Sequence, residues 1–112
     1  MDIIETIKEQ IAANTILLYM KGAPNAPQCG FSAKASQAIM ACGEKFAYVD
    51  ILQNPEIRAN LPKYANWPTF PQLWVAGELV GGSDIITEMQ ADGSLQALIK
   101  DAAANAAAKT DA

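Results

Sequence analysis

The first twenty residues change from a helical to a strand-like pattern of apolar positions. Four isoleucines between Asp2 and Ala13 fall on one helical face, so this segment is predicted to form an amphipathic helix with Asp2 as its N-cap. Residues 15–20 are instead a continuous apolar run of strand-forming residues. Such a run is typical of a buried strand with a parallel neighbour.

The following segment predicts a strand–loop–helix–strand unit. Residues 21–28 are rich in glycine and proline and predict a loop. After Cys29 the spacing is helical up to Gly43, which is expected to end the helix. Residues 46–50 predict a second short strand, and the resulting βαβ unit is expected to be right-handed. The predicted buried face of the helix consists of Phe31, Ala35, Ala38, Ile39 and Cys42.

The middle of the chain predicts a helix, an irregular connection and a hairpin. Asn54 followed by Pro55 is a typical helix start, and Pro62 is expected to weaken that helix. Residues 66–71 contain two X-Pro bonds and predict an irregular connection. Two short apolar segments within residues 72–80 flank an Ala-Gly pair and predict a β-hairpin.

Two helices complete the chain, and the elements together predict the fold class. Residues 81–84 open a helix that Gly93 ends, and Ser94 is expected to cap the last helix. The predicted architecture is α/β, with a four-stranded mixed sheet made of the βαβ unit and the hairpin and with helices on both faces. The chain has 112 residues, the length of one domain. We expect this domain to span residues 1–107 and the alanine-rich residues 108–112 to fray.

Charge and composition exclude several classes of function. Eight Lys and Arg residues against 12 Asp and Glu give a formal net charge of −4, which disfavours binding to nucleic acid or to an anionic membrane surface. The longest apolar run is too short for a membrane helix, and the first ten residues lack the features of a secretory signal or transit peptide. We therefore expect a cytoplasmic protein. The sequence has no histidine, which excludes Cys–His and Ser–His catalytic pairs and histidine-bound zinc.

The two cysteines have different predicted roles. Cys29 lies where the loop meets a helix N-terminus, a position that stabilises a thiolate, and Lys21 can add a positive charge from across the loop. The alternative interpretation is a buried structural cysteine. Cys42 follows 13 residues later, roughly 20 Å away along the helix, whereas a disulfide needs about 4.4–6.8 Å between Cα atoms. We interpret Cys42 as a core residue.

The residue three positions after Cys29 constrains the chemistry. In a C-x-x-C site this position holds a second thiol, but here it is Ser32. Any redox cycle therefore requires an external thiol. An iron–sulfur cluster needs about four thiolates, so one chain cannot hold it alone, whereas two chains and two small thiols can.

Other polar residues indicate what the small thiol is. Residues 81–84 (Gly-Gly-Ser-Asp) place backbone N–H groups and a carboxylate at a helix start, a combination that suits an α-amino-acid head group. Lys21 and Arg58 can hold a second carboxylate. A tripeptide thiol with two carboxylates and one amine fits this pattern. The alternatives are a simple Gly-Gly turn and a solvated arginine.

Four segments in order give the chain a family resemblance. They are Met-Lys-Gly at residues 20–22, Pro-Gln-Cys-Gly-Phe-Ser at 27–32, Trp-Pro-Thr-Phe-Pro at 67–71 and Gly-Gly-Ser-Asp at 81–84. The sequence closely resembles the single-domain monothiol glutaredoxins from about residue 3 to residue 99. This resemblance implies a thioredoxin-like fold.

The resemblance also implies a glutathione site. Lys21 and Arg58 match residues that contact the carboxylate side of glutathione. Phe70, before a cis-proline, matches a residue whose backbone pairs with the cysteinyl residue of glutathione, and Ser83 and Asp84 match the positions that hold its γ-glutamyl head group. Family members often have a cysteine where this chain has Ser83, so resolution of Cys29 by that cysteine is not expected here.

The resemblance further implies that the protein carries a [2Fe–2S] cluster. Cys29 from each of two protomers and two glutathiones would hold the cluster, so that the loaded form is a homodimer. The implied partners are BolA-like proteins and iron–sulfur recipient proteins. The alternative is a glutathione-dependent thiol–disulfide oxidoreductase that removes glutathione from substrates by a monothiol mechanism. A third possibility is a binding module in which Cys29 is inert.

Overall fold

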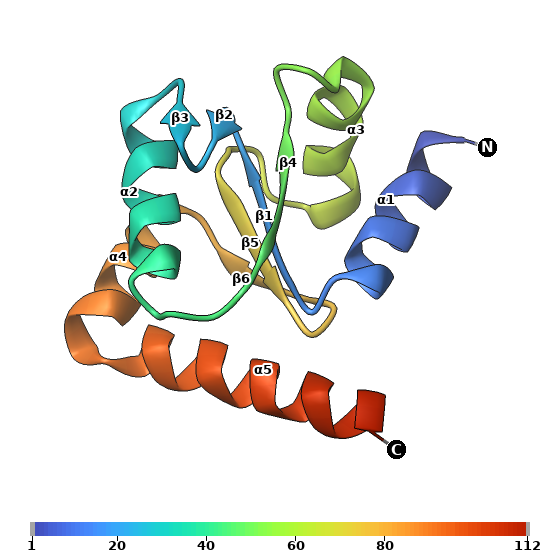
Figure 1. Ribbon diagram of the computed structural model, residues 1–112. Helices are drawn as coiled ribbons and strands as arrows, with labels where there is room; N and C mark the ends of the chain where they lie inside the picture. Colours follow the sequence, from blue (N-terminus) through green and yellow to red (C-terminus); the bar gives the residue numbers. More distant parts are fainter. Residues whose placement is uncertain (1, 112) are drawn as a thin grey trace.

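The computed structural model describes the backbone of residues 2–111 and the side chains of residues 2–106. Its centre is a four-stranded sheet in the order β4-β1-β5-β6 (Figure 1). The strands are β1 (Ile16–Met20), β4 (Ala47–Asp50), β5 (Gln72–Val75) and β6 (Glu78–Gly81). β1 pairs parallel with β4 and antiparallel with β5, and β5 pairs antiparallel with β6. The predicted mixed sheet, with its βαβ unit and hairpin, is confirmed.

In the described part of the chain, five helices cover the two faces of the sheet, as predicted. α1 (Ile3–Ala13) and α3 (Pro55–Ala65) lie on one side, and α2 (Gly30–Met40), α4 (Ser83–Asp92) and α5 (Ser94–Asp111) lie on the other (Figure 1). No helix in the described part of the chain is long and apolar enough to cross a membrane.

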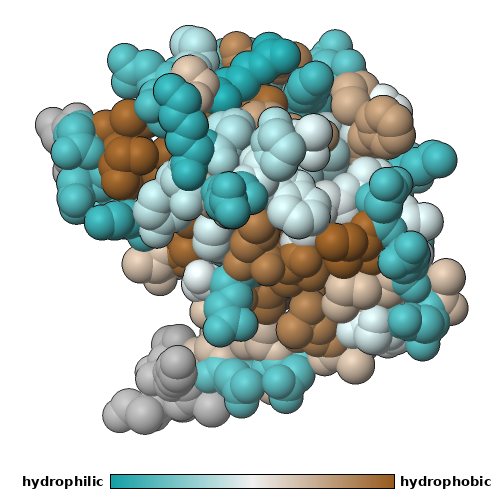
Figure 2. Space-filling model, turned by 180° about the vertical axis from the view of Figure 1, so that it is seen from behind, coloured by the Kyte–Doolittle hydropathy of each residue, from teal (hydrophilic) through white to brown (hydrophobic). Residues whose placement is uncertain are grey.

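The central strand β1 supplies both halves of the core because its side chains alternate between the two faces. Leu18 and Met20 pack in the cluster formed with α2, α4 and α5. Leu17 and Tyr19 pack in the cluster formed with α1 and α3. Burial on both faces explains why residues 15–20 read as a continuous apolar run. Figure 2 shows the molecule from behind, with hydrophobic residues gathered directly above α5.

The predicted buried face of α2 is wrong at its first residue. Phe31 is 62% exposed, and the helix instead buries Ser32, Ala35, Ser36, Ala38 and Ile39. Apolar spacing missed the two serines because their hydroxyls have protein partners that make burial possible. The Ser32 Oγ accepts a hydrogen bond from the Lys21 N–H at 3.0 Å, and the Ser36 Oγ donates to the Ala33 carbonyl at 3.1 Å.

Two local predictions also need correction, and a third stays a prediction. The predicted loop at residues 21–28 contains a short antiparallel pair, β2 (Gly22–Ala23) with β3 (Ala26–Pro27). α3 continues through Pro62 to Ala65, and the predicted weakening of the helix at this proline stays a prediction. Ser94 is the first residue of α5 and not its cap.

The predicted C-terminal boundary is not tested by the structure. The expected fraying concerns residues 108–112, whose side chains lie outside the described residues. The end of the domain at residue 107 therefore stays a prediction.

The turn at Gly22 leads to a stability prediction. Gly22 has φ +90°, and a Cβ there would lie 2.6 Å from the backbone oxygen of Ala26. Gly43 has φ +80° but open space around it. We expect Gly22→Ala to lower the free energy of unfolding by roughly 3 kcal/mol, from φ strain plus overpacking. Gly43→Ala is the control, with a loss of roughly 1 kcal/mol from φ strain alone. Urea denaturation of both variants measures the difference, and equal losses would contradict the steric argument.

Candidate functional site

Cys29 occupies the N-cap of α2 and is partly exposed. Its Sγ accepts a hydrogen bond from the Ser32 backbone N–H at 3.4 Å. The sulfur therefore lies at the positive end of the helix dipole, where a thiolate is stabilised. Partial exposure and this contact argue against the alternative of a buried structural cysteine.

The surroundings of Cys29 lower the pKa of its thiol. Partial burial alone would raise that pKa, but it is outweighed by hydrogen bonds from the backbone and side chain of Ser32 and from the Phe31 N–H. The positive charge of Lys21 adds to the lowering. The sequence-based prediction of an activated thiol near Lys21 is therefore supported by the geometry.

The turn that carries Lys21 is held in place by three hydrogen bonds. The Lys21 N–H donates to the Ser32 Oγ at 3.0 Å, and the Lys21 carbonyl accepts from the Gln28 N–H at 2.9 Å. The next N–H, of Gly22, donates to the Asp50 Oδ1 at 2.9 Å. Ser32 thus contacts both the Cys29 sulfur and the backbone of Lys21.

Cys42 lies in the core, as predicted. Its side chain is 5% exposed, and its Sγ–H contacts the Ala38 carbonyl at 3.5 Å. Burial raises the pKa of the Cys42 thiol. Both cysteines are free thiols, and they have opposite pKa shifts because only Cys29 has donors around its sulfur.

A cavity of about 470 Å³ begins at the first turn of α2. This volume is in the range of small-molecule sites. Three predicted site residues, Phe70, Ser83 and Asp84, meet there, although Cys29 itself is not part of the lining. The residues that line it are Phe31, Trp67, Thr69, Phe70, Gly82, Ser83, Asp84 and Ile85.

Two features of this cavity suit a polar ligand. Gly82 is the N-cap of α4. Because glycine has no side chain that could accept a hydrogen bond, the first N–H groups of this helix have no side-chain cap. The Trp67 Nε1 is buried and has no hydrogen-bond partner among the described residues. A Cβ at position 82 would lie 3.4 Å from this Nε1 and 3.2 Å from the Pro71 oxygen. Glycine therefore keeps this corner of the cavity open.

The structure does not bring all of the predicted ligand residues together. The peptide bond between Phe70 and Pro71 is cis, as the family resemblance implied. Arg58 is exposed on α3 and does not line the cavity. Its predicted contact with a carboxylate stays a prediction.

Some residues of the cavity were missed by sequence reasoning. Trp67 and Thr69 lie within the quoted Trp-Pro-Thr-Phe-Pro segment, which was the available signal. Phe31 was misassigned to the core because its apolar character fitted the helical spacing. Its exposed ring instead forms a wall of the cavity.

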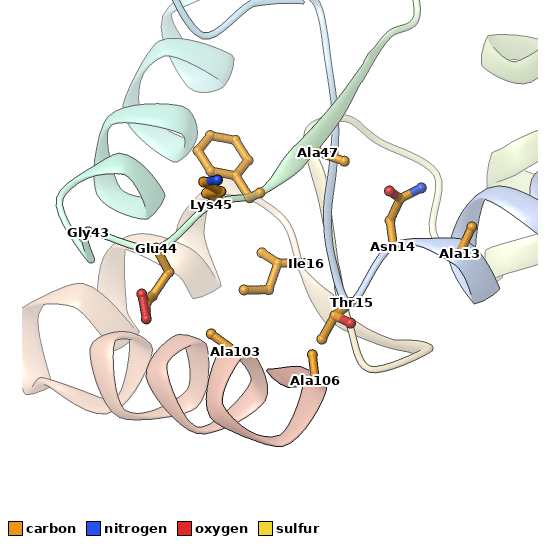
Figure 3. Close-up of a pocket in the computed structure, with 11 residues that line it drawn as sticks. Ala13, Asn14, Thr15, Ile16, Gly43, Glu44, Lys45, Ala47, Ala103 and Ala106 are labelled. Carbon is orange, nitrogen blue, oxygen red and sulfur yellow. The ribbon is translucent and has the colours of Figure 1, made fainter. Parts of the chain in front are cut away.

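A larger cavity lies at the opposite end of the sheet. It has a volume of about 660 Å³ and lies where α5 passes below the start of β1. Figure 3 shows Ile16, Ala103 and Ala106 pointing into it, with Glu44 at its border. It contains neither cysteine, whereas Cys29 lies at the other end of α2. We therefore place the candidate site at the smaller cavity beside Cys29.

The described residues contain no group of three or more His, Cys, Asp or Glu side chains that could hold a metal ion.

The charge of Lys21 leads to a pH-dependent prediction. In Lys21→Met the pKa of Cys29 should rise, because one of the groups that stabilise the thiolate is removed. The pKa of this thiol is lower in the folded protein than in the unfolded chain. Its ionisation therefore adds to the free energy of unfolding as the pH rises from the folded-state pKa to the unfolded-state pKa. Lys21→Met should shrink this gain. The rate of Cys29 alkylation against pH, in a Cys42→Ala background, measures the shift.

Lys34→Met is the matched control for this experiment. Lys34 is an exposed lysine on the same helix as Ser32, and it is not among the groups that shift the Cys29 pKa. Its removal should leave the alkylation profile unchanged. Equal shifts in the two lysine variants would contradict a specific effect of Lys21.

Comparisons with known proteins agree with this geometry. The glutaredoxin family model matches residues 16–80. Glutaredoxin 4 of Escherichia coli strain K12 is 73% identical over 101 residues, which cover 90% of this chain and 88% of the relative. Glutaredoxin 4 of Haemophilus influenzae is 62% identical over 104 residues, or 93% of this chain and 97% of the relative.

Solved structures of similar proteins share the fold. The match to the solution structure of reduced poplar apo GrxS14 has a TM-score of 0.75 at 38% identity. It covers 88% of this chain and 91% of the poplar chain. The match to the solution structure of a monomeric truncated mutant of Trypanosoma brucei 1-C-Grx1 has a TM-score of 0.79 at 32% identity. It covers 90% of this chain and 92% of the trypanosome chain. The chain therefore belongs to the glutaredoxin family, as a monothiol member with a thioredoxin-like fold.

Proposed function

We propose that this glutaredoxin binds glutathione beside Cys29 and carries a [2Fe–2S] cluster between two protomers, for iron–sulfur cluster assembly or delivery. The observation that carries the proposal is a partly exposed thiol of lowered pKa, next to a ligand-sized cavity, with Ser32 where a second thiol would lie. A cluster needs about four thiolates. Cys29 of each protomer supplies one, and two glutathiones supply the others.

Each predicted residue has a role in glutathione binding. The Asp84 carboxylate and the N–H groups at the start of α4 suit the amine and the carboxylate of the γ-glutamyl head group, and Ser83 lies at the same helix start. The backbone of Phe70 is proposed to pair with the cysteinyl residue. Lys21 and Arg58 are proposed to hold the remaining carboxylate.

The partners and setting of this function are also proposals. Loaded protomers would form a homodimer, and BolA-like proteins and iron–sulfur recipient proteins would be its partners. We place the protein in the cytoplasm, with the domain spanning residues 1–107. Because glutathione is not part of the chain, the ligand set can dissociate, and this lability suits transfer of the cluster to a recipient.

Native mass spectrometry tests the composition of the loaded form. After anaerobic reconstitution with iron, sulfide and glutathione, we expect a species of two chains, two glutathiones and one [2Fe–2S] cluster. A cluster on a single chain, or a loaded dimer without glutathione, would contradict the proposed ligand set.

The lowered pKa of Cys29 favours a second function that uses the same residues. The Cys29 thiolate would attack the glutathione sulfur of a protein–glutathione mixed disulfide and release the protein thiolate. A second glutathione thiolate would then attack the Cys29–glutathione disulfide, release glutathione disulfide and restore the Cys29 thiolate. Rapid turnover of a glutathionylated substrate, with saturation by glutathione, would support this activity.

A further inference from the structure

Gln72 is a polar residue in the protein interior. It begins β5, is 0% exposed, and is one of three buried polar side chains among the described residues, with Ser32 and Ser36. A buried amide is costly unless its donors and acceptor have partners. Its position directly after the 66–71 connection, which lines the candidate cavity, suggests where those partners lie.

All of the polar groups of Gln72 have protein partners. Its Nε2 donates to the Trp67 carbonyl at 3.1 Å and to the Thr69 carbonyl at 3.3 Å. Its Oε1 accepts from the Trp74 Nε1 at 3.2 Å. Trp74 in turn stacks on Tyr64 of α3, with ring centroids 6.3 Å apart. Gln72 thus joins the 66–71 connection to the sheet and, through Trp74, to α3.

The 66–71 connection needs such a partner. It belongs to no helix or strand, and Pro68 and Pro71 lack the N–H donors that would pair it with a neighbour. Two of its carbonyls are instead bound by one rigidly held side chain. Both carbonyls face this buried donor, and Trp67, Thr69 and Phe70 of the same connection line the cavity.

We propose that Gln72 is a positioning residue for ligand binding, which fixes the 66–71 connection so that Trp67, Thr69 and Phe70 form a preorganised wall of the cavity. Gln72 does not line the cavity itself and acts only through the connection. The inference rests on the proposed glutathione site and deepens it, because it names a buried residue that sets the affinity of that site. Ordering the wall in advance removes an entropic cost from binding.

Glutathione titration of Gln72→Met tests the effect on affinity. Methionine keeps the length of the side chain and removes all three hydrogen bonds, so we expect the Kd to rise about tenfold. Trp74→Phe removes the bond to Oε1 and reduces the buried ring that stacks on Tyr64, but it keeps both carbonyl contacts, so its Kd should stay within about twofold of wild type. Equal Kd values for wild type and Gln72→Met would overturn the proposal.

Tyr19→Phe is the matched control for stability. Tyr19 lies opposite Gln72 in the β1–β5 register and in the core cluster that contains Trp74, and its hydroxyl donates to the Gln10 Oε1 at 2.9 Å. This variant loses a core hydrogen bond that does not involve the connection. We expect a lower melting temperature but an unchanged Kd. If Tyr19→Phe weakened binding as much as Gln72→Met does, a general loss of stability would explain both, and the proposal would fail.

A measurement without ligand separates this inference from the proposed function. In NMR spectra of ligand-free Gln72→Met, the backbone amide of Trp67, which donates to the Pro62 carbonyl at 3.1 Å, should exchange faster with solvent than in wild type, while those of β1 stay protected. If Gln72→Met does not fold, the side-chain amide hydrogens of Gln72 in wild type provide the test. They should exchange more slowly than those of exposed Gln37, and equal rates would overturn the proposal. If wild type binds no glutathione while these amides are protected, the proposed function fails and the structural role of Gln72 stands.

Discussion

Replacing Cys29 with serine should abolish both cluster loading and thiol turnover. Cys29 is the partly exposed cysteine of the chain, and its thiolate is stabilised at the N-terminus of α2. A serine hydroxyl fits the same N-cap position, so the fold should be retained. Iron and sulfide content after anaerobic reconstitution, and the rate of turnover on a glutathionylated substrate, should both fall to background.

Cys42→Ser is the control for this variant. Cys42 is buried and has a raised pKa, so it offers no thiolate to a cluster or a substrate. The control should keep cluster loading and turnover, with some loss of stability from a hydroxyl in the core. If Cys29→Ser kept its cluster, its turnover and its binding partners, the protein would be a binding module in which Cys29 is inert.

Placing a thiol at position 32 should convert the monothiol site into a dithiol site. The Ser32 N–H lies 3.4 Å from the Cys29 Sγ, and the three-residue spacing is that of C-x-x-C sites. With glutathione disulfide, wild type should form a Cys29–glutathione disulfide and release one glutathione. In Ser32→Cys the introduced thiol should then attack Cys29 and release the second glutathione. Mass spectrometry should show bound glutathione on wild type and an internal disulfide in the variant.

Ser36→Cys is the control, because Ser36 is buried on the same face of α2 but one turn further from Cys29. Its thiol cannot reach Cys29, so this variant should stay glutathionylated. Persistent glutathionylation of Ser32→Cys would contradict the predicted conversion to a dithiol site.

Sequence patterns predicted the fold well where burial follows apolar character. The buried strand β1 and the helix start at Cys29 were both predicted from the sequence. Phe31 was misplaced because helical spacing cannot distinguish a core ring from one that lines a cavity. Ser32 was recognised as a monothiol marker, but its bond to the Lys21 backbone depends on tertiary structure.

The candidate site was only partly predictable for the same reason. Residues in contiguous motifs, such as Phe70, Ser83 and Asp84, were found and meet in one cavity. Gln72 has no local signal, because its three partners are set by the path of the 66–71 connection. Arg58 fits a charge argument, but its exposed place on α3 leaves that argument without a contact.

The central claim is that one reactive thiol per chain recruits glutathione to complete a set of cluster ligands. The most direct test is the visible absorption spectrum, with an iron and sulfide assay, of anaerobically reconstituted protein before and after removal of glutathione. The account predicts a brown protein with bound iron and sulfide that bleaches when glutathione is withdrawn. A colourless protein in the presence of iron, sulfide and glutathione, or a colour that survives complete removal of glutathione, would contradict it.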